Sequence, residues 1–261
     1  MTLPLGHIAV GLALVGCSFH SNDAPPASTT IDAPPGQGSI DGPPADIDAP
    51  MVDAIPKVYC ATCAEIGSSA ADTDVTLYLD HDPNKPWAAH CHGSNPDTYL
   101  VLGGGTNTSS YPTGGCASVS NGESKAVTTT WTMVRFDPVT RIVSTGDYFG
   151  STSAGGTHEV SGNGSIDNNY AHVPFASGRT CSTSQRSLAA VDLSQTNFAV
   201  ALGQPWTLDG FMASGNPSTS GDRKKVSFNI GGFPVGVSPC APNFDYYTTT
   251  GGACLTLDYA P

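Results

Sequence analysis

The sequence predicts an all-β domain: a disulfide-stapled, antiparallel β-sandwich-like fold with long loops rich in Gly, Ser and Asn. Three features predict this fold. Charged residues make up only 12% of the 261 residues, against roughly 25% in typical globular chains. Outside the first few dozen residues, no long run has apolar residues at helical spacing. Short runs of Val, Thr, Tyr and Phe instead alternate with Gly, Asn, Pro and Ser, as strands alternate with turns.

The stretch from Thr128 to Asp147 carries a strong strand signal, because it is dense in β-branched and aromatic residues. Asp137-Pro138 in its middle favours a type I turn. We therefore expect a hairpin, with one strand ending at Phe136 and the next running through Ile142 and Val143. Large apolar side chains fall on both faces, which predicts a hairpin covered on both sides near the centre of the core. These side chains are Trp131, Met133, Val134 and Phe136.

Residues 1–16 have the features of a signal peptide. Ile8 to Val15 is an apolar run of eight residues, too short to span a bilayer, which takes about 20, and typical of the apolar part of a signal peptide. The run ends in Leu14-Val15-Gly16-Cys17, which resembles the lipobox of bacterial lipoproteins, so we expect lipidation at Cys17. The alternative is an ordinary secretory peptide with an incidental cysteine. No Lys or Arg precedes the apolar run, which leaves the position of the start codon open.

Residues 17–56 are predicted to be a lipid-anchored, disordered tether rich in Asp, Ala and Pro. Asp-Ala-Pro-Pro or a close variant recurs four times, and residues 1–56 hold six Asp and no Lys or Arg. Proline removes hydrogen-bond donors and the carboxylates repel one another, so this segment cannot build a core. Such spacers resemble those of lipoproteins from myxobacteria and their relatives. Ser18 follows the cysteine, and by analogy with the sorting rule for such lipoproteins the lack of Asp at this position favours the outer membrane. We therefore expect an exported protein at the cell envelope, on the outer membrane or cell surface.

Residues 57–261 form the folded domain in this interpretation. They hold the remaining 16 acidic residues (22 minus 6) and all 10 basic residues. An acidic domain with scattered bases has no electrostatic footprint for nucleic acid, which excludes that partner. The expected partners are the membrane, through the N-terminal lipid, and an unknown extracellular protein or glycan.

Seven cysteines follow Cys17, and in an exported chain they predict a disulfide framework. Because seven is odd, one thiol is left over or pairs between chains. The spacing of Cys60 and Cys63 also fits a redox pair or half of a zinc ribbon, but the chain lacks a βαβ setting for the first and a second CxxC for the second. The disulfide candidates are Cys60, Cys63, Cys91, Cys116, Cys181, Cys240 and Cys254.

A series of short segments follows in a characteristic order along residues 57–261. The segments are Cys63-Ala-Glu-Ile66, Val75 to Leu79, Trp87-Ala-Ala-His-Cys91, Thr98 to Leu102, Val134-Arg-Phe-Asp137, Val173-Pro-Phe-Ala176 before Cys181, and Leu188 to Leu193. Their order and spacing resemble the GON domain, the C-terminal module of some ADAMTS-type secreted zinc metalloproteases. The resemblance runs from about Cys60 to Cys254 and implies a disulfide-bonded, non-catalytic module.

The chain departs from the GON pattern at three places. The Gly of the family's Asp-Gly-x-Tyr is missing from Asp74-Val-Thr-Leu-Tyr78, the second cysteine after Cys181 is absent, and the terminal cysteine cluster is reduced to Cys240 and Cys254. The family's disulfide connectivity therefore does not transfer. Zinc proteolysis belongs to the protease domain that accompanies the GON module, and this chain contains no HExxH sequence.

Asp80-His81-Asp82 and His90-Cys91-His92 form a dense cluster of metal-ligand residue types. If the strand ending at Leu79 pairs with the strand beginning at Trp87, three histidines would converge, because alternate residues of a strand share a face. Zinc binds such sets of His and Asp. The candidate zinc ligands are Asp80, His81, His90 and His92. The alternative is that these are loop and surface residues, and no cofactor other than this zinc is expected.

The expected function is that of a cell-envelope lipoprotein that presents a non-catalytic GON-like binding or adhesion module. No catalytic residue is predicted, because the chain has neither HExxH nor a G-x-S-x-G elbow after a strand. One alternative is a metal-dependent hydrolase, or a protein associated with a metalloendopeptidase, that uses His81, His90 and His92. A second alternative is a carbohydrate-binding module, whose ligand face would hold Trp206, Phe211, Tyr246 and Tyr247.

Two further predictions concern loops. Ser151 to Asn169 is rich in Gly, Ser and Asn, and we expect a long mobile loop there, which on a rigid β scaffold often carries a binding contact. Asn107 and Asn163 each begin an N-glycosylation sequence, which matters only in a host that has the glycosylation machinery.

Overall fold

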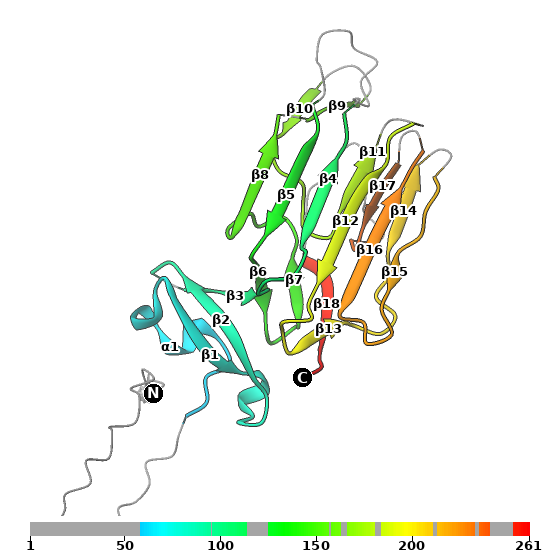
Figure 1. Cartoon of the computed structure of the whole chain (residues 1–261). Coiled ribbons are helices and arrows are strands. Elements are labelled where there is room, and N and C mark those ends of the chain that lie inside the picture. The colour runs from blue at the N-terminus through cyan, green and yellow to red at the C-terminus, as the bar shows by residue number, and fades with distance from the viewer. Residues whose placement is uncertain are drawn as a thin grey trace, which may run out of the picture.

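The computed structural model describes residues 58–94, 96–113, 125–156, 158–162, 166–180, 184–210, 213–232, 235–240 and 253–261. These residues form the all-β, antiparallel fold that the sequence predicts (Figure 1). Their helical segments are short, namely α1 (Cys63–Ile66), η1 (Ser68–Ala70) and η2 (Leu79–His81). The predicted signal peptide, the lipidation site Cys17, the tether, Cys116 and Cys181 lie outside the described residues.

Two large sheets make up most of the described fold. The seven-stranded sheet has the order β1 (Thr73–Tyr78), β2 (Pro86–His92), β3 (Asp97–Val101), β6 (Met133–Asp137), β7 (Ile142–Ser144), β18 (Ala253–Tyr259) and β13 (Phe198–Val200). The six-stranded sheet has the order β15 (Ser218–Thr219), β16 (Lys225–Ile230), β12 (Ser187–Asp192), β4 (Thr108–Tyr111), β5 (Val127–Trp131) and β8 (Ser151–Gly155).

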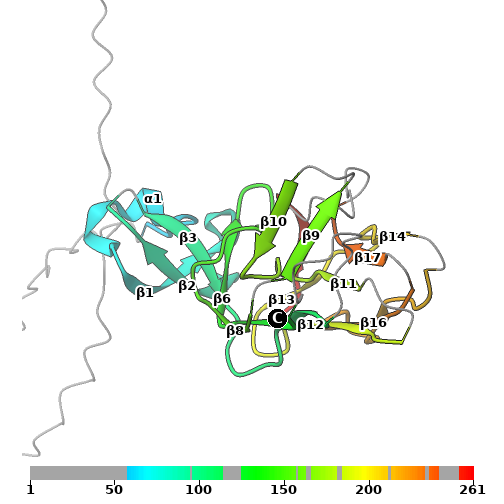
Figure 2. The same ribbon diagram turned by 90° about the horizontal axis from the view of Figure 1, so that it is seen from above.

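Two smaller sheets complete the fold. One has the order β11 (Gly178–Thr180), β17 (Val235–Ser238) and β14 (Thr207–Gly210), and it lies against one face of β12 and β16 in both views (Figures 1 and 2). The other is the hairpin of β9 (His158–Gly162) and β10 (Ile166–Tyr170). Residues 58–101, with α1, β1, β2 and β3, project to one side of the rest, and we call them the N-terminal wing (Figure 1).

One hydrophobic core joins the large sheets, because their strands alternate between buried and exposed side chains. The wing is attached to this core through aromatic rings. Trp87 of β2 meets Phe136 of β6 edge to face, with ring centroids 5.4 Å apart, and Phe198 of β13 contacts both of these rings. Edge-to-face packing of this kind adds to the stabilisation from burial alone.

The predicted β-hairpin is confirmed as β6 and β7, in which Asp137 pairs with Ile142. The Asp137 carboxylate accepts hydrogen bonds from the backbone N–H groups of Val139 and Thr140, which is the Asx-type contact expected at the start of such a turn. The expectation that this hairpin is covered on both sides is wrong. The chain leaves the six-stranded sheet after Trp131, bends at Thr132 and enters the seven-stranded sheet. Each strand therefore buries one face, and the buried parity shifts at the bend.

The predicted long loop over Ser151 to Asn169 is also wrong. Its first part is β8, which pairs with β5, and the rest contributes the β9–β10 hairpin. The sequence between these two strands begins Asn163-Gly164, a pair that favours the tight turns of hairpins. The polar composition of this segment led to the loop prediction, but backbone pairing with a neighbouring strand is enough to form strands here.

Five of the predicted disulfide cysteines lie in the described residues. Cys63 of α1 is bonded to Cys91 of β2, with the Cα atoms 5.5 Å apart, and Cys240 is bonded to Cys254 of β18, with the Cα atoms 5.1 Å apart. Cys60 is also disulfide-bonded. The staple between Cys63 and Cys91 ties the helix to the centre of the wing.

Asn107 is not a surface residue, because only 2% of it is exposed. Its side-chain amide donates to the carbonyl of Asp192, and its side-chain oxygen accepts from the Asp192 backbone N–H. This pair of bonds joins the loop before β4 to the end of β12. The side chain is therefore committed to a buried structural contact and is closed to glycosylation, while Asn163 lies outside the described residues.

The carboxylate of Asp192 stabilises the fold in its ionised form. Burial raises the pKa of Asp192, but hydrogen bonds from the side chain and backbone of Ser194 and the ion pair with Lys225 at 3.0 Å together outweigh burial and lower the pKa to about 2. Because the pKa is lower in the folded than in the unfolded chain, this stabilisation is present above pH about 4 and is lost as the pH falls toward about 2.

Replacing Asp192 with asparagine is therefore expected to lower the free energy of unfolding by about 2 kcal/mol at pH 7. Urea unfolding of the variant and the wild type at several pH values between 7 and 3 would measure this. The difference is expected to narrow toward the acid end. As a control, Lys225→Met should cost less, because the Ser194 hydrogen bonds remain. A gap that stays constant over the whole pH range would contradict this role.

Candidate functional site

Charged, imidazole and aromatic side chains gather on one side of the wing and of the neighbouring strand β6. Most of them reach solvent, but Tyr99 is covered by its neighbours and only 2% exposed. Strand register places Asp74 opposite His90, His90 opposite Tyr99, and Tyr99 opposite Arg135. Residues directly opposite in antiparallel strands project from the same face. These four side chains therefore form a row across β1, β2, β3 and β6.

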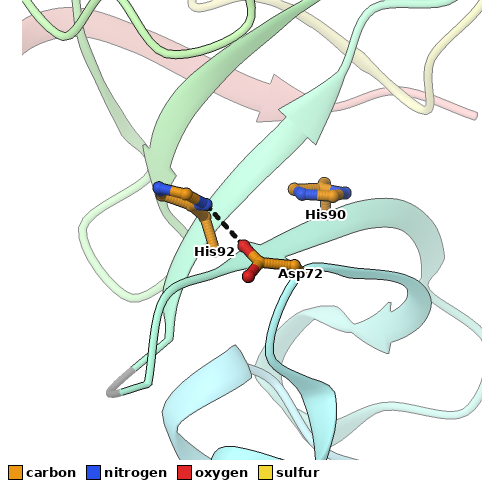
Figure 3. Close-up of side chains that lie close together, drawn as sticks. All are labelled: Asp72, His90 and His92. Atoms are coloured by element: carbon orange, nitrogen blue, oxygen red, sulfur yellow. Dashed lines mark hydrogen bonds and ion pairs between the residues drawn. The ribbon is translucent and has the colours of Figure 1, made fainter.

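A second row lies next to the first. His92 follows His90 by two residues and so shares its face, and it is opposite Asp97. Asp72 stands just before β1, and its Oδ1 atom is 2.6 Å from Nδ1 of His92. Figure 3 shows Asp72, His90 and His92 close together. The ligand atoms that the three residues can offer to a metal ion all lie within 4.8 Å of one another.

The loop between β7 and β8 supplies an aromatic ring to this surface. Phe149 stacks on His92, with ring centroids 3.7 Å apart and an angle of 20° between the planes, and it also contacts Tyr99 at 4.9 Å. From the same loop, Asp147 accepts a hydrogen bond from the Tyr99 hydroxyl at 3.0 Å. We call the combined surface the His92–Phe149 face. Its members are Asp72, Asp74, His90, His92, Asp97, Tyr99, Arg135, Asp147 and Phe149.

Burial and hydrogen bonds shift the pKa values of two groups on this face. Burial, together with the hydrogen bond to the Asp147 carboxylate, raises the pKa of Tyr99, so the phenol remains protonated and acts as a donor. The hydrogen bonds from the Gly93 backbone N–H and from His92 lower the pKa of Asp72. Asp72 is therefore a carboxylate at neutral pH, which is the form that accepts hydrogen bonds and coordinates metal ions.

The predicted convergence of His81 with His90 and His92 is wrong. His81 lies at the closed end of the β1–β2 hairpin, where its Nε2 atom is 3.0 Å from Glu65, whereas the other two histidines lie near the open end. Asp80 does not join them either. Its carboxylate pairs with Lys85 at 2.9 Å and with Arg141 at 3.1 Å, which lowers the pKa of Asp80.

Asp72, Asp74 and Phe149 belong to the site and were not among the candidates from the sequence. The two carboxylates reach the histidines because of the register of β1 against β2, and a shift of one residue would move them to the other face. A count backward along the hairpin from its turn would have placed Asp74 opposite His90. No signal in the sequence indicates that Phe149 folds back onto β2.

One serine and one histidine meet elsewhere in the fold. Ser153 Oγ of β8 is 2.9 Å from His172 Nδ1, and the same oxygen is 2.7 Å from the hydroxyl of Thr129. Thr129 also accepts a hydrogen bond from the backbone N–H of Val173. The hydroxyls thus connect β5, β8 and the segment after β10 in a chain of structural hydrogen bonds.

Trp206, one of the aromatic residues of the predicted carbohydrate site, is half-buried. Its ring packs edge to face on Phe228 with centroids 4.7 Å apart, and it borders the hydrophobic core. The other aromatic residues of the predicted carbohydrate site, Phe211, Tyr246 and Tyr247, lie outside the described residues.

Comparison with protein families, curated proteins and solved structures finds no match to this chain. The GON resemblance therefore remains an interpretation of the sequence. Among the described residues, no helix is both long and apolar enough to cross a membrane.

Proposed function

We propose that this protein is an exported lipoprotein that presents a non-catalytic, GON-like binding or adhesion module at the cell envelope. The observation that carries the proposal is the His92–Phe149 face, where aromatic rings and charged groups share one surface built on paired strands. Binding sites commonly combine aromatic walls with a few polar groups that fix the orientation of the ligand. Attachment through Cys17 and the acidic tether would hold this face away from the membrane.

The charged groups of the face are arranged in pairs and remain accessible. Arg135 pairs with Asp97 at 2.7 Å, and close to half of each side chain is exposed. Strand pairing fixes the backbone beneath them, so little side-chain and backbone freedom would be lost on binding. Such an arrangement suits recognition of an extracellular protein or glycan, whose polar groups can bridge to the paired donors and acceptors while an apolar part contacts Phe149.

The binding proposal predicts that Phe149→Ala weakens ligand binding by at least about tenfold, equivalent to about 1.4 kcal/mol. The full chain would be applied to an array of immobilised glycans and an array of immobilised secreted proteins. Leu202→Ala is the matched control, because Leu202 is 85% exposed and lies in the turn after β13. Absence of wild-type binding on both arrays would overturn the binding function. Equal binding by Phe149→Ala would overturn the assignment of the face.

The attachment part of the proposal is tested separately. Cys17→Ser is expected to move the protein from the membrane fraction to the soluble fraction of the host and to abolish labelling by a radioactive fatty acid. Retention in the membrane with no fatty acid incorporated would contradict the lipid anchor.

Metal-dependent hydrolysis is a second candidate function, favoured by the closeness of Asp72, His90 and His92, and it would appear as cleavage of the arrayed proteins only when metal is present.

A further inference from the structure

We propose that Asp72, His90 and His92 bind a divalent transition-metal ion, with zinc as the ion of this class to test first. This inference goes beyond the proposed function and does not depend on it. Two imidazoles and one carboxylate form a ligand set that zinc uses, with water or another group in the fourth position. The possible ligand atoms lie within 4.8 Å of one another (Figure 3), so small side-chain movements bring them to one ion.

Backbone pairing, rather than chance surface proximity, brings the three residues together. His90 and His92 alternate along β2 and project from one face. Thr73 pairs with Cys91, so Asp72, the residue before it, arrives beside His92. Asp72 has φ of 53°, a left-handed conformation that Asp adopts more readily than most residues. Its carboxylate is held there by His92 and by the Gly93 backbone N–H.

Metal-binding histidines usually form a hydrogen bond through the ring nitrogen that does not bind the ion, and His90 has such a bond. Its Nδ1 atom is 2.7 Å from Oδ1 of Asp74. A carboxylate on one ring nitrogen orients the imidazole and makes the other nitrogen a better ligand. In this arrangement Nε2 of His90 is the atom available to the ion, and Asp74 acts as a positioning residue.

The surroundings of the site restrict the motion of the ligands. The ring of His92 is stacked on Phe149, which limits its rotation. Cys91 lies between the two histidines on the opposite, buried face and is bonded to Cys63. A strand fixed at this position presents both imidazoles with little conformational entropy left to lose, which favours binding.

The charge of the cluster also favours a cation. Asp72 and Asp74 are both acidic, and their side chains are 66% and 82% exposed. The charged side chains facing the two histidines from neighbouring elements are Asp97 on β3, Arg135 on β6 and Asp147 on the β7–β8 loop. Arg135 is paired with the carboxylates of Asp97 and Asp147. Asp72 and Asp74 are therefore the negative charges next to the imidazoles.

The wing contains a further histidine–carboxylate pair, which serves as a comparison for the proposed metal site. His81 and Glu65 form another histidine–carboxylate pair at 3.0 Å, also exposed to solvent, yet no second histidine stands beside them among the described residues that could share an ion. If two ligands were enough, this pair would bind metal as well. The proposal requires that it does not.

The experiment uses the full chain without a polyhistidine tag, treated with a chelator and then titrated with Zn²⁺ by calorimetry. One ion per chain is expected. His90→Ala and His92→Ala should each weaken binding by more than Asp74→Asn, which is expected to lose about 10–100-fold because it removes only the orienting carboxylate. His81→Ala should leave the affinity unchanged. Circular dichroism of each variant shows whether the fold is retained.

A second readout reports the ligands directly. Co²⁺ in place of Zn²⁺ should give the visible absorption bands of a four- or five-coordinate ion with nitrogen ligands, and these bands should be lost in His92→Ala. Three results would overturn the proposal: no stoichiometric Zn²⁺ binding by the wild type, a Zn²⁺ affinity in His90→Ala or His92→Ala equal to that of the wild type, or a loss in His81→Ala as large as theirs. Failure of metal binding would leave the Phe149-dependent binding of proteins or glycans untouched, so the two proposals are tested separately.

Discussion

Replacing Phe136 with alanine is expected to lower the free energy of unfolding by about 3–5 kcal/mol, the range typical of buried aromatic residues truncated to alanine. Only 2% of Phe136 is exposed. It lies in β6, an inner strand of the seven-stranded sheet, and its ring contacts Trp87 and Phe198. The substitution removes one of the two rings through which Trp87 of the wing contacts the rest of the core, and it leaves a cavity beside Trp87 and Phe198.

Urea unfolding followed by tryptophan fluorescence would measure this loss, since Trp87 contacts the substituted ring. Leu202→Ala is the control, because its side chain is exposed and a surface change of this kind usually stays within about 0.5 kcal/mol. Phe136→Leu should fall between the two, as it fills part of the cavity. A loss below about 1 kcal/mol in Phe136→Ala would mean that the wing and the remaining sheets do not share one core.

The parts of this fold that depend on neighbouring residues could be predicted from the sequence. Asp137 and Pro138 determine a turn through contacts within four residues, so the hairpin of β6 and β7 was predictable. The bend at Thr132 was not, because the residues on either side of it have the same strand-forming character. Where a strand leaves one sheet for another depends on the packing of distant strands, which local composition does not contain.

The candidate site was predictable to the same limited extent. His90 and His92 could be placed on one face from their spacing alone, because strand side chains alternate. Asp72 could be assigned only from the register of β1 against β2. Phe149 comes from a loop more than 50 residues further along the chain, and nothing local indicates that it stacks on His92. His90 and His92 could thus be placed from the sequence, whereas Asp72 and Phe149 could be assigned to the site only from the tertiary structure.

The disulfide partner of Cys63 could not be predicted from the sequence either, and removing this disulfide is expected to have a large effect on stability. Spacing alone could not select Cys91 from the other candidates, but the structure pairs them across a sequence separation of 28 residues. Replacing both with alanine is expected to lower the free energy of unfolding by about 3–4 kcal/mol, because the unfolded chain regains the entropy of an open loop. Alanine avoids placing a new polar group at two fully buried positions.

Unfolding in urea with and without a reductant separates the covalent bond from the packing of its sulfur atoms. Without reductant, the Cys63→Ala/Cys91→Ala variant should be less stable than the wild type, and with reductant the difference should nearly vanish because both chains then lack the bond. A difference that persists in reductant would assign the loss to a cavity instead. Because Cys91 stands between His90 and His92, the same variant should also bind Zn²⁺ more weakly. Unchanged Zn²⁺ affinity would show that strand pairing alone positions the two imidazoles.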